Sequence, residues 1–280
     1  MLFTSLSVNN SKWNDSLASF PLPSYIYIMI PLRDDNSDRR STPVVNYLII
    51  AANIFVFMFL QDFGTNYEFT YAYSTVPAEI LTGKDIVTEG RIVRDAASGE
   101  SYVLPGLSPT PISVYLTLIT SMFMHGGIGH ILGNMLYLFI FGDNVEDRMG
   151  HLRYLFFYIL CGVIASLAHV FSCSIFGNSL YVPSLGASGA ISAILAAYMV
   201  LFPGKRVLVL ILRFITPVPA VLAIGVWFLF QLINGLWMLG GGSGGGVAYA
   251  AHIGGFLAGL ALVRLFAPRR RPRYVEWYYG

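Results

Sequence analysis

Tyr154–Ser172 reads YLFFYILCGVIASLAHVFS, a run of apolar residues that holds no Asp, Glu, Lys or Arg. A continuous apolar run of about 17–25 residues is long enough to cross the hydrocarbon core of a bilayer as an α-helix. The strands of a membrane barrel would alternate apolar and polar residues instead. This stretch therefore predicts a transmembrane helix.

The same pattern recurs elsewhere along the chain. Comparable runs occupy Pro43–Leu60, His125–Gly142, Leu185–Phe202, Pro217–Leu239 and Ala250–Phe266. We therefore expect an all-α polytopic membrane protein with six transmembrane helices in one bundle. The apolar segment 111–124 either extends the second span or forms a helix in the membrane interface.

The composition supports a membrane protein. Hydrophobic residues make up 55% of the chain and charged residues 11%, against roughly 25% charged residues in an ordinary soluble domain. These values exclude a soluble globular enzyme and a disordered chain. The net charge of +2 leaves no broad basic surface for phosphate contacts, which excludes a nucleic-acid partner.

The basic residues orient the bundle. With a cytoplasmic N-terminus and six crossings, 14 of the 17 Lys and Arg residues lie inside and 3 outside, as the positive-inside rule requires. We therefore expect a cytoplasmic segment 1–42, a membrane domain 43–267 with a long acidic outer loop 61–110, and a basic cytoplasmic tail 268–280. Residues 1–28 do not resemble a signal peptide, which leaves Met29 as an alternative start, and the expected location is a bacterial plasma membrane.

Polar residues inside the predicted spans are the candidates for function, because burying them in lipid costs free energy. No Asp or Glu falls inside a span. This excludes an aspartyl intramembrane protease and disfavours a carrier built on buried carboxylates. The chain also has no His-Glu-x-x-His motif, and we expect neither a metal nor another cofactor.

Three polar groups lie at nearly one depth on three different spans. At a rise of 1.5 Å per residue, Ser188 lies about 21 Å from the cytoplasmic end of its span, His130 about 20 Å and His252 about 18 Å. Asn134 follows His130 by one helical turn and faces the same way. We predict that Ser188 and His252 form a nucleophile and its general base. The Ser188 N–H, His130 and Asn134 would then form an oxyanion hole.

An ordinary structural role is the alternative explanation for polar and small residues in membrane helices. A Ser in a membrane helix more often hydrogen-bonds to the carbonyl one turn before it, and that is the role expected of Ser192. Gly189, with Gly255 and Gly259 on the sixth span, predicts close helix packing rather than catalysis.

The fifth span carries two polar residues, Gln231 and Asn234, which we expect to hydrogen-bond between helices. Its aromatic residues, such as Trp227 and Phe228, are expected to face lipid or to belong to the aromatic belt at the membrane interface. Because hydrolysis at this depth needs water, we also predict a cavity open to the outer side and ringed by spans two, four, five and six.

Several short motifs follow one another along the spans. They are His125, His130-Ile131-Leu132-Gly133-Asn134, Glu146-Asp147-Arg148-Met149-Gly150, Gly186-Ala187-Ser188-Gly189-Ala190, and Ala251-His252-Ile253-Gly254-Gly255 with Gly259. Together, over about 43–266, they resemble the rhomboid family of intramembrane serine proteases. The Ser188 motif is not the nucleophile elbow of the α/β-hydrolases, which needs Gly where Ala190 stands.

The resemblance implies roles for these residues. Ser188 would be the nucleophile, His252 the general base, and His130 and Asn134 the oxyanion donors. His125, Gly186 and Gly189 would support the site, His125 near its entrance. The structural residues would be Gly255 and Gly259 in helix packing, and Glu146 and Arg148 in a polar network at the cytoplasmic end of the second span.

The resemblance also implies a substrate class. The substrates would be single-span membrane proteins, cut in or near the membrane segment, with the Gly-rich loop after the fifth span as a cap and that span as a lateral gate. Many bacterial relatives have a Tyr that stacks on the catalytic His where Ser192 stands here, so the group that orients His252 is left open. The alternative function is a non-proteolytic rhomboid-like protein that binds or chaperones membrane helices.

Overall fold

The computed structural model describes residues 29–94, 101–177, 180–239 and 247–267. In chain order its elements are β1 (Ile30–Asp34), α2 (Val44–Phe55), the π-helical turn η3 (Val56–Leu60), η4 (Asp62–Gly64), α3 (Tyr67–Ala72), α4 (Pro77–Thr82), β2 (Arg91–Arg94), β3 (Ser101–Leu104), η5 (Val114–Leu116), α5 (Thr117–Thr120), η6 (Ser121–Phe123), α6 (Ile128–Met149), α7 (His151–Phe176), α8 (Ser188–Leu201), β4 (Arg206–Ile211), β5 (Phe214–Pro219), α9 (Ala220–Leu239) and α10 (Tyr249–Phe266). The expectations for residues 1–28, for the Gly-rich loop 240–246 and for the tail 268–280 lie outside the described part.

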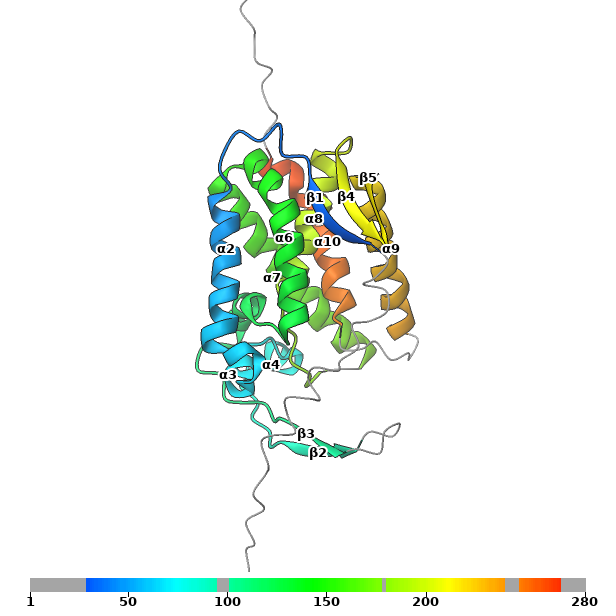
Figure 1. Cartoon of the computed structure of the whole chain (residues 1–280). Helices are drawn as coiled ribbons and strands as arrows, with labels where there is room; N and C mark the ends of the chain where they lie inside the picture. The colour runs from blue at the N-terminus through cyan, green and yellow to red at the C-terminus, as the bar shows by residue number, and fades with distance from the viewer. Residues whose placement is uncertain (1–28, 95–100, 178–179, 240–246, 268–280) are drawn as a thin grey trace, which may run out of the picture.

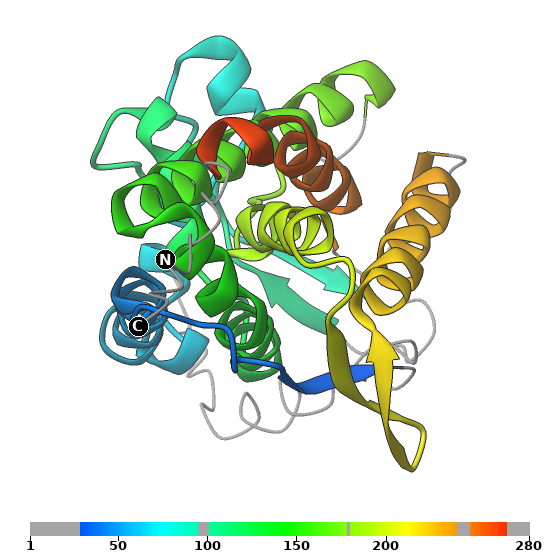
Figure 2. The ribbon, with the colours of Figure 1, turned by 90° about the horizontal axis from the view of Figure 1, so that it is seen from above.

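The helix α8 forms the centre of the bundle, with α9 at its periphery (Figure 2). Every residue from Gly189 to Tyr198 is buried. A helix that is apolar and buried on all sides needs small residues where its neighbours come closest, and Ala193, Ala196 and Ala197 supply them. The first residue of this central helix is Ser188.

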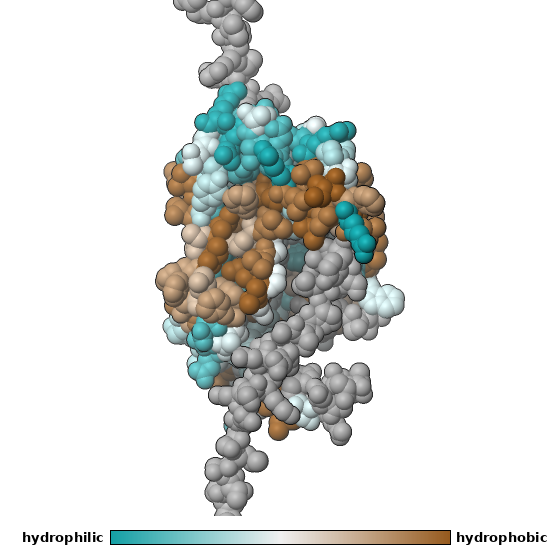
Figure 3. Space-filling model, viewed as in Figure 1, coloured by the Kyte–Doolittle hydropathy of each residue, from teal (hydrophilic) through white to brown (hydrophobic). Residues whose placement is uncertain are grey.

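Apolar side chains form a band around the middle of the molecule, between hydrophilic ends (Figure 3). Within the described residues, three helices are long and apolar enough to cross a bilayer, namely α7, α9 and α10. The segments Val44–Leu60 and Ser188–Leu201 are apolar but shorter. The membrane bundle is therefore supported, while the count of six spans stays a prediction.

The chain is mostly helical, but the prediction of an all-helical protein misses strands at both ends of the bundle. A three-stranded antiparallel sheet in the order β1–β4–β5 lies beside α9 (Figure 1), and a separate β2–β3 hairpin lies at the opposite end. In β4, Val207 and Val209 are buried and alternate with more exposed residues, which is the pattern of a strand. This segment lies between two predicted spans, where no element was predicted.

Two helices begin later than predicted, for local reasons. Pro217 and Pro219 lie in β5, so α9 begins at Ala220 rather than at Pro217. The helix α6, in the second predicted span, begins at Ile128, after an extended Gly127. The segment 111–124 does not extend this span, because it folds into the short turns η5, α5 and η6.

Two acidic residues of α6 fix the start of α2. Glu146 is fully buried, and its carboxylate accepts hydrogen bonds from the N–H groups of Val45 and Asn46 at 3.0 and 2.6 Å. It thereby supplies a negative charge to a helix N-terminus that has no acidic residue of its own. The preceding turn is held by Asp147, whose Oδ1 accepts from the N–H of Ser41 at 2.8 Å. Arg148 lies in the same last turn of α6.

A second polar cluster ties β1 to the bundle. Asp34 accepts hydrogen bonds from the hydroxyl of Tyr198 on α8 and from the amide of Asn144 on α6, at 2.9 and 2.6 Å. Burial raises the pKa of the Asp34 carboxyl, and these two donors oppose that rise. The Nζ of Lys205, before β4, donates to Asn144 at 3.0 Å. The sheet is therefore anchored to α6 and α8.

Candidate active site

An extended segment delivers Ser188 to the start of α8. Ser184 pairs with Thr75 through two backbone hydrogen bonds of 2.8 and 3.0 Å, and the N–H of Gly186 donates to the carbonyl of Ser121 at 2.8 Å. Gly186 has a φ of +120°, a backbone conformation that favours glycine. The chain thus turns sharply just before the helix, and the N–H groups of the first helical turn are left without intrahelical acceptors.

The structure brings Ser188 and His252 together across two helices. Nε2 of His252, in the first turn of α10, lies 2.7 Å from Oγ of Ser188. Both residues are partly exposed, so the pair lies at the surface of the bundle core rather than sealed inside it. A hydroxyl hydrogen-bonded to an imidazole is the arrangement of a serine nucleophile and its general base.

The contact between α8 and α10 explains why these side chains meet. A Cβ on Gly255 would overlap the carbonyl oxygen of Gly189, and a Cβ on Gly259 would lie 2.5 Å from the carbonyl oxygen of Ala193. The two backbones therefore touch along this face, as small residues permit in membrane helices. Gly255 follows His252 by three residues, so this packing sets the distance from His252 to α8.

The other nitrogen of His252 has a partner that the sequence alone does not assign to it. Nδ1 lies 2.8 Å from Oε1 of Gln231 on α9. Gln231 therefore hydrogen-bonds between helices as expected, whereas Asn234 donates to the carbonyl of Phe230 on its own helix at 2.7 Å. A polar residue inside an apolar span was the signal available in the sequence, but its partner depends on how α9 is rotated.

Two aromatic residues of α9 pack on α10. The ring of Trp227 lies 6.0 Å from the ring of His252, with 34° between the planes. Phe228 stacks on Phe256 with the ring centres 3.9 Å apart. The helix α9 thus turns this side toward α10, while both residues stay partly exposed, so their lipid-facing or belt position stays a prediction.

His130 and Asn134 lie beside the segment that precedes Ser188. A Cβ on Gly186 would lie 2.8 Å from Nε2 of His130 and 3.7 Å from Nδ2 of Asn134. Nδ1 of His130 accepts from the N–H of Gly126 at 3.3 Å, so the neutral ring carries its proton on Nε2. The donor nitrogens of both side chains are thus on the side of Gly186.

The amide of Asn134 has no hydrogen-bond partner for Nδ2 among the described residues, although it is buried. Leaving a buried donor unpaired costs about 1–3 kcal/mol. An oxygen that arrives next to Gly186 would relieve this cost. The arrangement can therefore stabilise a negative oxygen near Ser188.

His125 packs its ring against the ring of His130 from a position outside α6. It precedes the helix, contrary to the predicted span, and its ring lies edge-on to that of His130 at 5.1 Å. The amide of Gln61 fixes its backbone by accepting from the His125 N–H at 3.0 Å and donating to the His125 carbonyl at 2.8 Å. The side chain is completely buried.

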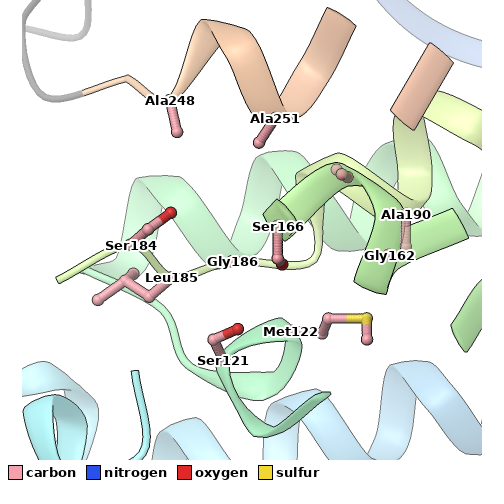
Figure 4. Close-up of a pocket in the computed structure, with 12 residues that line it drawn as sticks. Ser121, Met122, Gly162, Ser166, Ser184, Leu185, Gly186, Ala190, Ala248 and Ala251 are labelled. Atoms are coloured by element: carbon pink, nitrogen blue, oxygen red, sulfur yellow. The ribbon is translucent and has the colours of Figure 1, made fainter. Parts of the chain in front are cut away.

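A small cavity of about 20 Å³ lies next to the start of α8, large enough for one water molecule. Its lining includes the hydroxyls of Ser121, Ser166 and Ser184, with Gly186 and Gly189 nearby (Figure 4). Its walls come from η6, α7, α8, the start of α10 and the segment 184–186, and they include neither Ser188 nor His252. The larger cavity ringed by spans two, four, five and six therefore stays a prediction.

Comparison with known protein families shows which family this chain belongs to. The model of the Rhomboid domain matches residues 113–269. The chain belongs to the rhomboid family. The matched segment contains α6 to α10 and Ser188, His252, His130 and Asn134 of the candidate site. The family and the long apolar helices together show that the chain is a membrane protein.

Relatives come from bacteria and from mitochondria. Rhomboid protein 1, mitochondrial, of Saccharomyces cerevisiae is 31% identical over 52% of this chain and 40% of its own length. RHOMBOID-like protein 12, mitochondrial, of Arabidopsis thaliana is 35% identical over 55% of this chain and 48% of its own. Rhomboid protease GluP of Bacillus subtilis is 30% identical over 79% of this chain and 34% of its own. The chain thus spans less than half the length of each of these relatives.

Proposed function

We propose that this rhomboid-family protein is a serine-type intramembrane endopeptidase that cuts single-span membrane proteins in or near the membrane segment. The observation that carries the proposal is the 2.7 Å contact between Oγ of Ser188 and Nε2 of His252. A hydroxyl and an imidazole thus lie in hydrogen-bonding contact on adjacent helices, within a bundle that has an apolar band. The similarity to a bacterial rhomboid protease supports the same activity.

The reaction follows from the positions of these groups. Ser188 gives its proton to Nε2 of His252 while Oγ attacks the carbonyl carbon of the scissile bond. The oxygen of the tetrahedral intermediate accepts hydrogen bonds from the Ser188 N–H and from the side chains of His130 and Asn134. The imidazolium then protonates the leaving amine, and water, deprotonated by His252, hydrolyses the acyl-enzyme.

In a helical substrate, the backbone carbonyl that must be attacked is held in an intrahelical hydrogen bond. Its hydrogen bonds have to open before Oγ of Ser188 reaches the carbon, and a Gly or Pro near the cleaved bond lowers that cost. A small side chain at the cleaved bond is expected to fit best beside Gly186 and Gly189. Substrates with such residues are therefore expected to be cut faster.

The labelling test decides between a protease and a binding protein. We expect a fluorophosphonate to label the reconstituted protein on Ser188, as read by mass spectrometry of the modified peptide, and a single-span reporter to be cleaved. Ser188→Ala should abolish both signals, whereas Ser192→Ala should keep them, because Ser192 donates to the carbonyl of Ser188 at 2.7 Å and only bonds its own helix. A parent that is folded but neither labelled nor active would support a non-proteolytic helix-binding protein.

We also propose that the protein works in a bacterial plasma membrane with both termini in the cytoplasm. The distribution of basic residues supports this orientation. In right-side-out vesicles, a membrane-impermeant maleimide should modify Lys84→Cys but spare Arg213→Cys until the vesicles are opened. The native Cys161 and Cys173 are buried and give little background. Modification of Arg213→Cys in intact vesicles would indicate the opposite orientation.

A further inference from the structure

The ring of His252 is held from α9, a helix that carries neither Ser188 nor the oxyanion donors. Gln231 and Trp227 lie one turn apart on that helix and both contact the imidazole. Of the two contacts, only the hydrogen bond can choose which ring nitrogen carries the proton. An aromatic ring 6.0 Å away restrains the position of the imidazole but not its tautomer.

The amide of Gln231 has a defined orientation. Its Nε2 faces the carbonyl of Trp227 at 3.5 Å, so Oε1 is the atom that lies 2.8 Å from Nδ1 of His252. A carbonyl oxygen only accepts hydrogen bonds, so Nδ1 must carry the proton of the neutral ring. The lone pair of Nε2 then faces Oγ of Ser188, as a general base requires.

We propose that Gln231 is the positioning residue that fixes the tautomer and orientation of His252, an inference that rests on the proposed function. It performs the task that a buried carboxylate performs in a Ser-His-Asp triad. A neutral amide does so without placing a charge among apolar helices, where an ionised side chain is costly. Gln231 touches the base and not the substrate, so it acts through His252.

The surroundings of His252 leave this role to Gln231. The ring also meets Tyr249, edge-on at 6.4 Å, and the titratable side chains that act on it are His130 of α6 and His169 of α7. Both hydrogen-bond partners of the ring, Ser188 and Gln231, are neutral. Ser192, at the position of the stacking Tyr of many bacterial relatives, donates to Ser188 instead.

Three variants test the role in the full-length protein in proteoliposomes. Gln231→Ala should lower kcat for a single-span reporter, and the rate of fluorophosphonate labelling, by roughly tenfold to a hundredfold with KM changed less than about twofold, because a misplaced base loses rate and not binding. Gln231→Glu should restore most of the rate. It should also move the acidic limb of the pH–rate profile to higher pH by about one unit, since a carboxylate on Nδ1–H stabilises the imidazolium.

Asn234→Ala is the matched control. Asn234 lies one turn from Gln231 on α9 and bonds only its own helix, so its loss should leave kcat and the pH profile unchanged. A Gln231→Ala rate within twofold of the parent, or a Gln231→Glu profile that does not move, would overturn the positioning role. Equal losses in Gln231→Ala and Asn234→Ala would overturn it as well, since they would indicate a loosened helix.

A measurement that needs no turnover separates this inference from the proposed function. The chain has five histidines, so selective ¹⁵N labelling gives a spectrum simple enough to assign His252. We expect Nδ1–H in the parent and a mixture of tautomers in Gln231→Ala. An Nε2–H tautomer in the parent would overturn the inference even if the enzyme is active, and an inactive parent with Nδ1–H would overturn only the protease.

Discussion

Replacing His252 with Ala should lower the rate of peptide cleavage by roughly 10⁴- to 10⁶-fold, as loss of the base does in serine proteases of other folds. Ser188 would keep its position and its oxyanion donors, but its hydroxyl would have no base at 2.7 Å to take the proton. Fluorophosphonate labelling should fall in parallel. Binding of substrate should change little, since His252 acts in the transition state.

The measurement compares cleavage of a single-span reporter by purified variants in the same liposomes. Ser192→Ala serves as the control for a lost polar group beside the site, because its hydroxyl bonds only to the carbonyl of Ser188. Circular dichroism and the thermal midpoint should match those of the parent in both variants. If the His252→Ala protein retained a tenth of the activity, the imidazole of His252 would not be the general base.

Gly255→Val should have the second largest effect, on folding and on activity together. Its Cβ would overlap the carbonyl oxygen of Gly189, and the carbonyl carbon of Gly189 lies only 2.9 Å from the same point. These are backbone atoms of a buried helix, so α8 and α10 must move apart. Overpacking of a core typically costs about 1–3 kcal/mol, and we expect the upper end of that range or more.

The same displacement moves His252 away from Ser188. A shift of about 1 Å at reacting groups lowers rates by roughly a hundredfold, so any folded Gly255→Val protein should lose at least that much activity. Thermal unfolding in detergent and reporter cleavage give the two readouts. Gly225→Ala is the control, because no atom lies within 4 Å of a Cβ on Gly225 in α9. Parent-like stability of Gly255→Val would contradict the backbone contact.

The sequence predicted the bundle and the level of the polar groups because both depend on local pattern. Apolar runs of sufficient length specify helices in a membrane, and depth follows from the rise per residue. The structure places Ser188 within hydrogen-bonding distance of His252, and it places His130 and Asn134 beside Gly186. These contacts required only that three helices with small or polar faces pack together.

The remaining features depend on information that a periodic pattern does not contain. The strand β4 lies between two predicted spans and is too short to be one itself, so the search for long apolar runs missed the sheet. His125 was placed in a helix because the break at Gly127 depends on backbone conformation. The partner of Gln231 depends on the rotation of α9 about its axis, which the packing of Phe228 on Phe256 sets.

The direct passage from β5 into α9 has a consequence for how the bundle can open. Pro219 ends the strand and Ala220 begins the helix, so the sheet, itself anchored to α6 and α8, ties this end of α9 to the bundle (Figure 1). A movement of the opposite end of α9 would withdraw Gln231 from the imidazole. On the proposed positioning role, His252 would then lack the partner that fixes its tautomer until α9 closed again.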